Sequence, residues 1–504
     1  MLLEMAADGL GDRVVVGPKD SGITAERLRQ LARGGAAAVV AAGADALLYL
    51  ASNGPAFPVA MFAAAYAGVP LIPVNYRLGE AQLQQLLAKH PGAFAVADAG
   101  QSAAMGRAGI TGLNPVQWLE VADRHPHADP TPEDSPAVLI YTSGTTSAPK
   151  GVVLRHENLV SYVLAAVEFA SAGPDEAALM SVPPYHIAAV ANVITNLYAG
   201  RRVLTLESFT PAGWLELVRR ENVTNALVVP TMLTRVMEEP GLDLAVPTLR
   251  VLAYGGAQMP SRVVVRALEA WPDVDFVNAY GLTETSSTIA VLGPEEHRTA
   301  VASTDPVVRA RLGSAGRAVP AVELEIRDEA GRPVAPGVTG RIWVRGPQVS
   351  GEYTGSGPAL DERGFFDTRD EGFVDEDDYL FIGGRTDDTI IRGGENIAPA
   401  EIEDVLLAHP MVSDAVVVGV PDEEWGQRLE AAVVARPGAE VELDELKQFA
   451  KDRLRGSKTP VRIVLWEALP RTDTGKLIRR HALERLLAET ATPQLWQGAQ
   501  AGKL

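Results

Sequence analysis

The sequence predicts an α/β protein: a large N-terminal domain of parallel α/β subdomains with a β-rich subdomain, then a small mobile α+β C-terminal domain. Three observations predict it. Short apolar or β-branched runs alternate with helix-like stretches in the N-terminal part. Extended segments with Gly-rich turns follow from about residue 313. A third pattern, which mixes amphipathic helices and strands, begins after residue 385. Strand–helix alternation is typical of a parallel sheet that binds ligands at the carboxyl ends of its strands. With 504 residues, the chain is too long for one core.

The N-terminal strands are expected to be short and buried. They are Leu47–Leu50, Leu71–Val74, Ala93–Val96, Val138–Tyr141, Arg202–Leu206, Ala226–Val229, Val251–Tyr254 and Phe276–Asn278, and the helix-like stretches are Glu80–Lys89, Asn158–Phe169, Pro211–Glu221 and Pro260–Ala270. Residues 56–74 are uncharged and about long enough to span a bilayer, but Pro58, Pro70 and Pro73 interrupt them. We therefore expect a buried helix that leads through Gly68 into the next strand, and no membrane span.

The β-rich subdomain is expected at about residues 313–384, with extended segments at Glu323–Arg327 and Arg341–Arg345. The rest of the chain has the size and the mixture of helices and strands that are typical of a separate α+β domain. Its expected elements are a helix near Ala400–Ala408, strands Ala415–Val420 and Glu430–Val434, a helix at Leu443–Leu454 and a strand at Arg462–Trp466. The predicted domains are residues 1–386 and 387–504.

The charge balance limits the partners. The chain has 45 Lys and Arg against 64 Asp and Glu, a net charge of −19, which would repel phosphate backbones and anionic lipids. Nucleic acid is therefore not an expected partner. The absence of cysteine excludes a disulfide framework, a thiolate metal site and a cysteine nucleophile. No secretory signal is visible, and a reducing cytoplasm fits.

The most informative segment follows the strand at residues 138–140 and reads Tyr-Thr-Ser-Gly-Thr-Thr-Ser-Ala-Pro-Lys-Gly. Its hydroxyl groups, a glycine without side-chain bulk and a lysine form a concentrated set of donors for a polyphosphate. No Gly-Lys-Ser/Thr follows at the spacing of a P-loop. A Ser/Thr-rich surface loop is the alternative for this segment alone. The candidate polyphosphate-binding residues are Thr142, Ser143, Gly144, Thr145, Thr146 and Lys150.

This segment resembles the phosphate loop of the acyl- and aryl-CoA synthetases, which belong to the adenylate-forming superfamily with luciferases and peptide-synthetase adenylation domains. Ser147 stands where that family usually has glycine, which puts loop mobility or ATP affinity in doubt. The resemblance extends from about residue 35 to 485. It implies that His186 lies beside the substrate carboxylate and that Tyr280 stacks on adenine. It also implies a contact of Thr283 with the α-phosphate, magnesium on Glu284, and an adenine-contacting turn at Gly255, Gly256, Ala257 and Gln258.

The C-terminal segments of the family are also matched. The resemblance implies that Asp370 and Arg385 bind the ribose, that Asp387 is the hinge between domains, and that Lys476 acts in adenylation. Gly393 and Gly394 are implied to line the tunnel for the pantetheine of CoA. Arg369 replaces the family's usual glycine. As isolated features, Tyr280 and His186 would be core residues, and Glu284 and Lys476 solvated surface charges.

The implied enzyme is an ATP-dependent carboxylic acid–CoA ligase that uses ATP, Mg²⁺ and coenzyme A and forms an acyl-adenylate. One alternative is the loading of an acid onto the phosphopantetheine of an acyl carrier protein. A second is a non-catalytic nucleotide-binding protein on the same scaffold, against which the intact Glu284, Asp370, Arg385 and Lys476 argue. The sequence contains neither the motifs of a transition-metal site nor the nucleophile motif of an α/β-hydrolase. The sequence leaves the oligomeric state open.

The expected acid is an uncharged-tail monocarboxylic acid, medium-chain aliphatic or aryl. Amino-acid-activating relatives place an aspartate just after the position of His186, whereas residues 187–195 contain no acid and no base. An unpaired ammonium buried there would cost several kcal/mol. The small side chains would leave room for the tail. The candidate pocket residues are His186, Ala188, Gly255, Ala279, Gly281 and Ser287.

Overall fold

The computed structural model describes residues 1–125, 136–142, 150–385, 388, 390–392, 395–422, 425–454, 456–472 and 475–491. The chain forms two compact units. The first consists of residues 1–325, 343–368 and 375–380, and the second of residues 326–342, 369–374 and 381–504. The chain passes between them within strands of the β-rich segment. The second unit thus takes in parts of the segment before residue 387, where we predicted the domain boundary.

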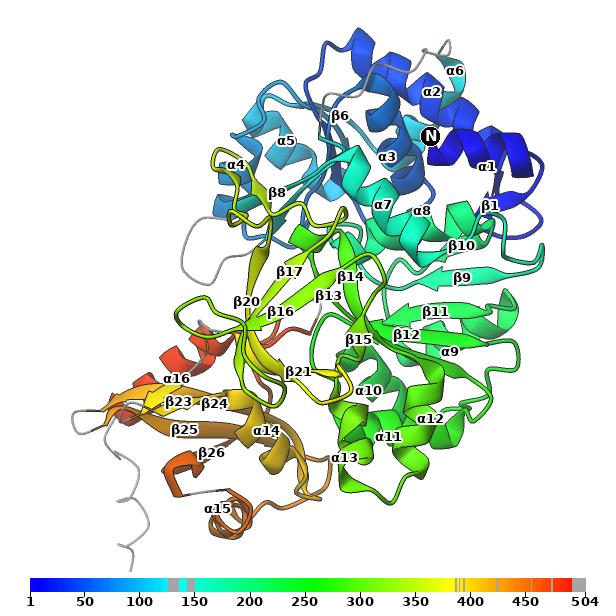
Figure 1. The fold of residues 1–504 in the computed structure, drawn as a ribbon. Coiled ribbons are helices and arrows are strands. Elements are labelled where there is room, and N and C mark those ends of the chain that lie inside the picture. Colours follow the sequence, from blue (N-terminus) through cyan, green and yellow to red (C-terminus); the bar gives the residue numbers. More distant parts are fainter. Residues whose placement is uncertain are drawn as a thin grey trace, which may run out of the picture. The chain divides into compact units, whose positions relative to one another are not determined.

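The first unit contains a large sheet whose described strands run in the order β15-β14-β13-β12-β11-β9-β10-β1-β2 (Figure 1). Strands β9 to β13 are parallel neighbours, whereas β14 is antiparallel to β13. The bounds are β1 Val14–Val16, β2 Ile23–Thr24, β9 Ala177–Met180, β10 Arg202–Thr205, β11 Asn225–Val228, β12 Val251–Gly255, β13 Asp275–Leu282, β14 Ser287–Leu292 and β15 Arg317–Ala318.

A second sheet of this unit has the order β19-β18-β8-β7-β4-β3-β5-β6 over the described residues. Strands β3 to β7 pair in parallel, but β8 pairs antiparallel with β7, and β18 antiparallel with β8. The bounds are β3 Leu47–Leu50, β4 Leu71–Pro73, β5 Phe94–Ala97, β6 Thr111–Leu113, β7 Val138–Thr142, β8 Lys150–Leu154, β18 Glu352–Tyr353 and β19 Gly357–Pro358.

Helices of the first unit connect and cover these strands. Thr24 caps α2 by accepting a hydrogen bond from the backbone N–H of Arg27. Helix α3 is buried on nearly all sides and ends at Gly68, whose φ is 71°. The helices are α1 Leu2–Leu10, α2 Ala25–Ala41, α3 Ala56–Ala67, α4 Glu80–Leu87, α5 Ser102–Ala108, α6 Pro115–Arg124, α7 His156–Ala166, α8 Ile187–Ala199, α9 Pro211–Arg220, α10 Pro230–Glu238, α11 Ser261–Ala270, α12 Pro294–Ala302 and α13 Pro306–Ala310.

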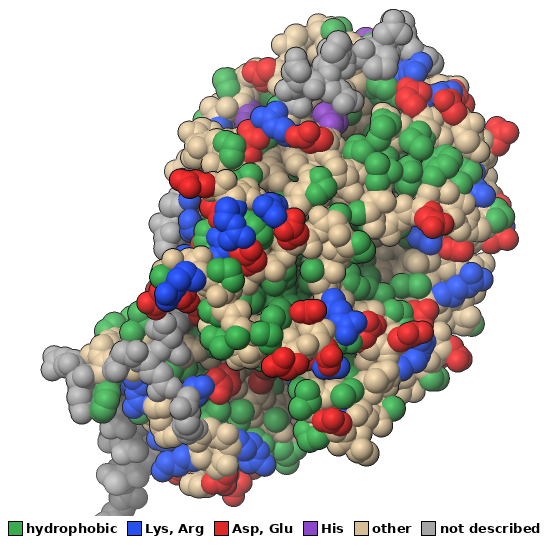
Figure 2. Space-filling view, in the orientation of Figure 1, with side chains coloured by type: hydrophobic (Ala, Val, Ile, Leu, Met, Phe, Trp, Pro, Cys, Tyr) green, Lys and Arg blue, Asp and Glu red, His purple; other side chains and the backbone are tan. Residues whose placement is uncertain are grey.

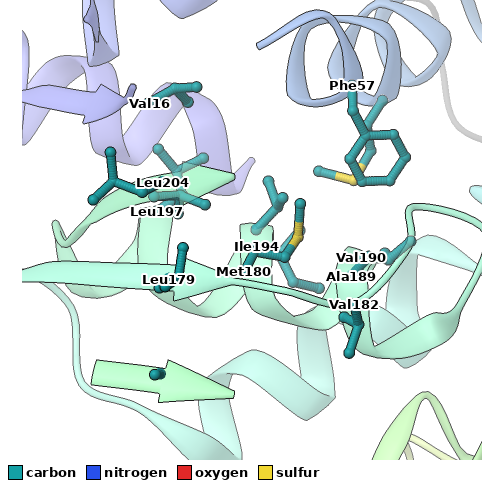
Figure 3. Packing of buried hydrophobic residues seen from close by; sticks show 14 of the residues in the cluster. Val16, Phe57, Leu179, Met180, Val182, Ala189, Val190, Ile194, Leu197 and Leu204 are labelled. Carbon is teal, nitrogen blue, oxygen red and sulfur yellow. The ribbon is translucent and has the colours of Figure 1, made fainter. Parts of the chain in front are cut away.

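One hydrophobic cluster joins these layers (Figure 3). Leu179 and Leu204 come from parallel strands, Ile194 from α8 and Phe57 from α3, and all four are nearly inaccessible to solvent. Burial of a large apolar side chain contributes about 1.5–3 kcal/mol. The side of α8 that carries residues 189, 190, 193 and 194 is therefore fixed to the core, whereas Ala188 and Asn192 stay half-buried on another side.

The β-rich segment contains a sheet of described strands in the order β16-β17-β20-β21, with β16 Glu323–Arg327, β17 Gly340–Arg345, β20 Phe366–Val374 and β21 Leu380–Arg385. The second unit adds a β22-β23 hairpin and the sheet β24-β25-β26, covered by apolar residues of its helices. The bounds are β22 Ile390–Arg392, β23 Glu395–Ile397, α14 Pro399–Leu407, β24 Val412–Asp422, β25 Gly426–Ala435, α15 Leu443–Lys451, β26 Arg462–Trp466 and α16 Arg479–Ala491.

The predicted α/β fold class is confirmed, and the predicted elements lie within a few residues of the observed ones. Residues 56–74 form helix α3 and strand β4, as expected. Among the described residues, no helix is both long and apolar enough to cross a membrane. Figure 2 shows acidic and basic side chains interspersed on the face in view, so the acidic excess is not gathered there into one patch.

Candidate active site

The predicted phosphate loop connects two neighbouring strands. Strand β7 ends at Thr142, and β8 begins at Lys150, which lies opposite Thr142 in the antiparallel pair. The two ends of the loop are therefore fixed side by side. Lys150 is exposed. The predicted residues Ser143, Gly144, Thr145 and Thr146, with Ser147, lie outside the described residues.

The predicted adenine turn follows strand β12. Gly255, the last residue of β12, pairs in parallel with Ala279 of β13. A Cβ atom on Gly255 would lie 2.2 Å from the carbonyl oxygen of Ala279, so this glycine permits close strand packing and does not leave open space. Gly256 has a φ of 85°, which favours glycine at the turn. Ala257 and Gln258 follow it on the exposed side of the turn.

The next predicted residues lie at the end of β13. Tyr280 and Gly281 are the third- and second-last residues of this strand, and Thr283 and Glu284 follow in a 3₁₀ turn over residues 283–285. A Cβ atom on Gly281 would lie 1.7 Å from the carbonyl oxygen of Ser287. Backbone atoms lie where a Cβ atom of Gly255 or Gly281 would be, so both glycines permit close packing of the strands, and their place in the substrate pocket stays a prediction.

Strain is concentrated directly after Glu284. Ser286 and Ser287 have φ values of 55° and 106°, which L-residues rarely adopt. Thr285 is fully buried, and its hydroxyl donates to the carbonyl oxygens of Leu282 and Ser287 and accepts from the N–H of Leu282. These bonds hold the unfavourable backbone in place, as is common at functional sites.

Glu284 is held by a segment distant in sequence. Its carboxylate oxygen Oε1 accepts a hydrogen bond of 2.9 Å from the hydroxyl of Tyr353. The ammonium of Lys150 lies over the same ring, 5.7 Å from its centroid. Tyr353 thus links the end of the phosphate loop to Glu284. The sequence analysis missed Tyr353, because no local motif pairs a tyrosine with a carboxylate that far away along the chain.

The side chains at this site suit magnesium bound together with ATP better than they suit a metal ion coordinated by protein side chains alone. In the part of the chain that the structure describes, no cluster of three or more His, Cys, Asp or Glu side chains could hold a metal ion. Mg²⁺ is commonly held by one or two carboxylates together with substrate phosphates. Glu284, which Tyr353 links to Lys150, meets this requirement.

His186 directly precedes helix α8 as its N-cap. Its Nε2 atom is buried and has no hydrogen-bond partner among the described residues. Burial, and then the charge of Arg77, lowers the pKa of His186 to about 4. The imidazole is therefore neutral at pH 7 and can offer a hydrogen bond to a ligand. Ala188, another predicted pocket residue, lies half-buried in the first turn of α8.

In the second unit, two predicted ribose-binding residues pair with each other. Arg385 Nε lies 3.1 Å from the carboxylate of Asp370, which is buried. Arg369, beside Asp370, is exposed and has a φ of 59°. The left-handed backbone explains why glycine suits this position. The predicted hinge Asp387 and tunnel residues Gly393 and Gly394 lie outside the described residues.

The predicted adenylation lysine, Lys476, is exposed in a tight turn of the second unit. Its N–H donates to the hydroxyl of Thr472 and its carbonyl accepts from the N–H of Thr472. Arg471 donates to the carbonyl of Gly475 and forms a two-pronged ion pair with Asp414. The main chain on both sides of the lysine is therefore anchored, and the residue is exposed.

Comparison with known proteins identifies relatives of the whole chain. Residues 3–354 match the family described as AMP-binding enzyme, and residues 401–476 match the AMP-binding enzyme C-terminal domain. A fatty acid–[acyl-carrier-protein] ligase, ScoC of Streptomyces coeruleorubidus, is 33% identical over 93% of this chain and 92% of its own. A feruloyl-CoA synthase of Amycolatopsis sp is 35% identical over 91% of this chain and 92% of its own.

Solved structures of similar fold agree with this family match. The o-succinylbenzoate CoA synthetase (MenE) of Bacillus subtilis in complex with its acyl-adenylate intermediate has a TM-score of 0.83 and 26% identity, covering 100% of this chain and 99% of that chain. Its complex with ATP and magnesium has a TM-score of 0.81 and 27% identity, covering 96% and 99%. The chain therefore belongs to the AMP-binding enzyme family and is an acid–thiol ligase of the adenylate-forming kind.

Proposed function

We propose that the chain joins an uncharged-tail monocarboxylic acid, medium-chain aliphatic or aryl, to coenzyme A through an acyl-adenylate, and releases AMP and pyrophosphate. The observation that carries the choice of acid is helix α8. Its half-buried side begins at His186 and continues through Ile187, Ala188 and Asn192 without a charged group. Arg202, which follows this helix, is buried and committed to Glu221 at 3.0 Å, so it is not available for a second substrate carboxylate.

Two of the relatives support this choice, whereas the o-succinylbenzoate named for the MenE structure carries two carboxylates. The names of the fatty acid ligase and the feruloyl-CoA synthase both indicate acids with one carboxylate and no amino group. An ammonium buried beside α8 would lose its hydration without gaining an acidic partner from this helix, at a cost of several kcal/mol.

In the proposed first half-reaction, the substrate carboxylate attacks the α-phosphorus of ATP and pyrophosphate leaves. Lys476 would neutralise charge that develops on the α-phosphate, and Thr283 would donate to it. Magnesium on Glu284 would balance the charge of the ATP phosphates. Neutral His186 would orient the acid without attracting a competing anion by charge.

In the second half-reaction, the thiol attacks the acyl carbon and AMP leaves. Two incoming groups cannot share one fixed lid, so residues 387–504 would change orientation about Asp387 between the two steps. Lys476 would then withdraw and leave space for the pantetheine. We place this chemistry in the cytoplasm, where a chain without cysteine needs no oxidising conditions.

The test is pyrophosphate release over a panel of carboxylic acids, measured with and without CoA. Medium-chain and aryl monocarboxylic acids should give the fastest release, and CoA should convert the adenylate to a thioester. Fastest release with a free amino acid or a short dicarboxylate would refute the substrate assignment.

A carrier protein is the second candidate acceptor, because one relative covering 93% of the chain is named as an acyl-carrier-protein ligase. The two acceptors are distinguished by adding either CoA or a holo acyl carrier protein to the enzyme with acyl-adenylate already bound. Faster thioester formation on the carrier would favour this second function.

A further inference from the structure

Glu284 is held through both its backbone and its side chain by residues 350–353. Its carbonyl oxygen accepts from the N–H groups of Ser350 and Gly351, at 2.9 and 3.2 Å. Its carboxylate oxygen Oε1 accepts from the hydroxyl of Tyr353 at 2.9 Å. Main-chain bonds fix where Glu284 lies, and the Tyr353 bond fixes how its carboxylate is turned.

The segment that carries Tyr353 is itself bound to the strand after the phosphate loop. Tyr353 pairs with Val152 in the antiparallel β8-β18 ladder, and the N–H of Thr354 donates to the carbonyl of Gly151 at 2.8 Å. Lys150, the first residue of β8, places its ammonium over the Tyr353 ring at 5.7 Å from the centroid. One side chain therefore contacts both a carboxylate and a lysine of the predicted ATP site.

We propose that Tyr353 is a positioning residue for adenylation, which orients the Glu284 carboxylate for magnesium and keeps Lys150 beside the phosphates. The proposal rests on the roles proposed above for Glu284 and Lys150. Mg²⁺ demands near-ideal octahedral geometry, so a carboxylate free to rotate would bind it less well. With Oε1 occupied by the hydroxyl, Oε2 would be the oxygen available to magnesium. Partners of this kind typically affect metal affinity or activity by about 10- to 100-fold.

The experiment compares Tyr353→Phe, which removes the hydroxyl and keeps the ring, with Tyr353→Leu, which removes both. Mn²⁺ affinity is measured by electron paramagnetic resonance in the presence of a non-hydrolysable ATP analogue. Tyr353→Phe should weaken Mn²⁺ binding and slow ATP–pyrophosphate exchange, each by about 10-fold or more. Excess Mg²⁺ should restore much of the exchange. Thioester formation from supplied acyl-adenylate should be unchanged.

Tyr353→Leu should also lower the affinity for the nucleotide measured without metal, by roughly 3-fold, because the aromatic ring beneath the Lys150 ammonium is lost. The matched control is Tyr66→Phe, which removes another Tyr–Glu hydrogen bond, 2.6 Å from the Tyr66 hydroxyl to Glu4, between helices α3 and α1. This control should leave Mn²⁺ affinity and exchange unchanged, so it measures the general effect of such a loss.

Wild-type Mn²⁺ affinity in Tyr353→Phe, or equal damage to both half-reactions, would overturn the proposal. The metal titration needs no acid substrate, so it decides the role of Tyr353 independently of catalysis. Failure of the unsubstituted protein to exchange pyrophosphate with any acid would count instead against the proposed function.

Discussion

Replacement of Arg369 by glycine should give a more stable protein than replacement of Arg369 by alanine. Arg369 has a φ of 59° within strand β20, in the left-handed region that costs an ordinary residue about 1–2 kcal/mol. Both substitutions remove the same exposed side chain, so the contacts of that side chain cancel in the comparison. Glycine relieves the strain but loses about 0.5–1 kcal/mol more conformational entropy on folding. The difference leaves a net gain of roughly 0.5–1 kcal/mol over alanine at this position.

The assay is urea-induced unfolding of Arg369→Gly and Arg369→Ala, compared through their midpoints and slopes. The matched control is the same pair of substitutions at Arg341, which is exposed in β17 and is not among the described residues with positive φ. There, glycine should be less stable than alanine by about 0.5–1 kcal/mol. The predicted difference in stability between the glycine and alanine variants therefore has opposite signs at positions 369 and 341. A glycine variant less stable than the alanine variant at both would refute the reasoning.

Three further predictions concern the site. Lys476→Ala should slow adenylation by on the order of 10²–10³ and spare thioester formation from acyl-adenylate, measured in separate half-reaction assays, because the charge is needed only at the α-phosphate; equal loss in both would contradict this role. Because the pKa of His186 is lowered to about 4, the unfolded chain binds a proton between pH 6.5 and 4 that the folded chain does not, so the free energy of unfolding should fall by up to about 3 kcal/mol across that window. His186→Ala should remove this share of the pH dependence in urea unfolding, and an unchanged dependence would exclude His186 as its source. Gly281→Ala should lower stability by about 1–3 kcal/mol or more, because its Cβ would lie 1.7 Å from the Ser287 carbonyl oxygen. The control Gly313→Ala has open space and should change the denaturation midpoint little.

The sequence by itself determined the fold class, the family and the order of the site segments. Short apolar strands gave a clear signal because parallel strands are buried on both faces. The phosphate-loop motif was readable because the required donors lie within a few consecutive residues. Helix α8 was not predicted; its residues are mostly apolar and buried, which periodicity alone does not assign to a helix or a strand. Strand β8 was not predicted either, although it places Lys150 opposite Thr142.

Only the tertiary structure decided which distant residues meet and which backbone angles they adopt. The hydrogen bond from Tyr353 to Glu284 depends on the pairing of β18 with β8, which no local pattern encodes. The close approach of carbonyl groups from neighbouring strands to Gly255 and Gly281 was not visible in the sequence either. Sequence periodicity reports which side of an element is buried. It cannot report what lies opposite, because strand register and packing are set by the whole chain at once.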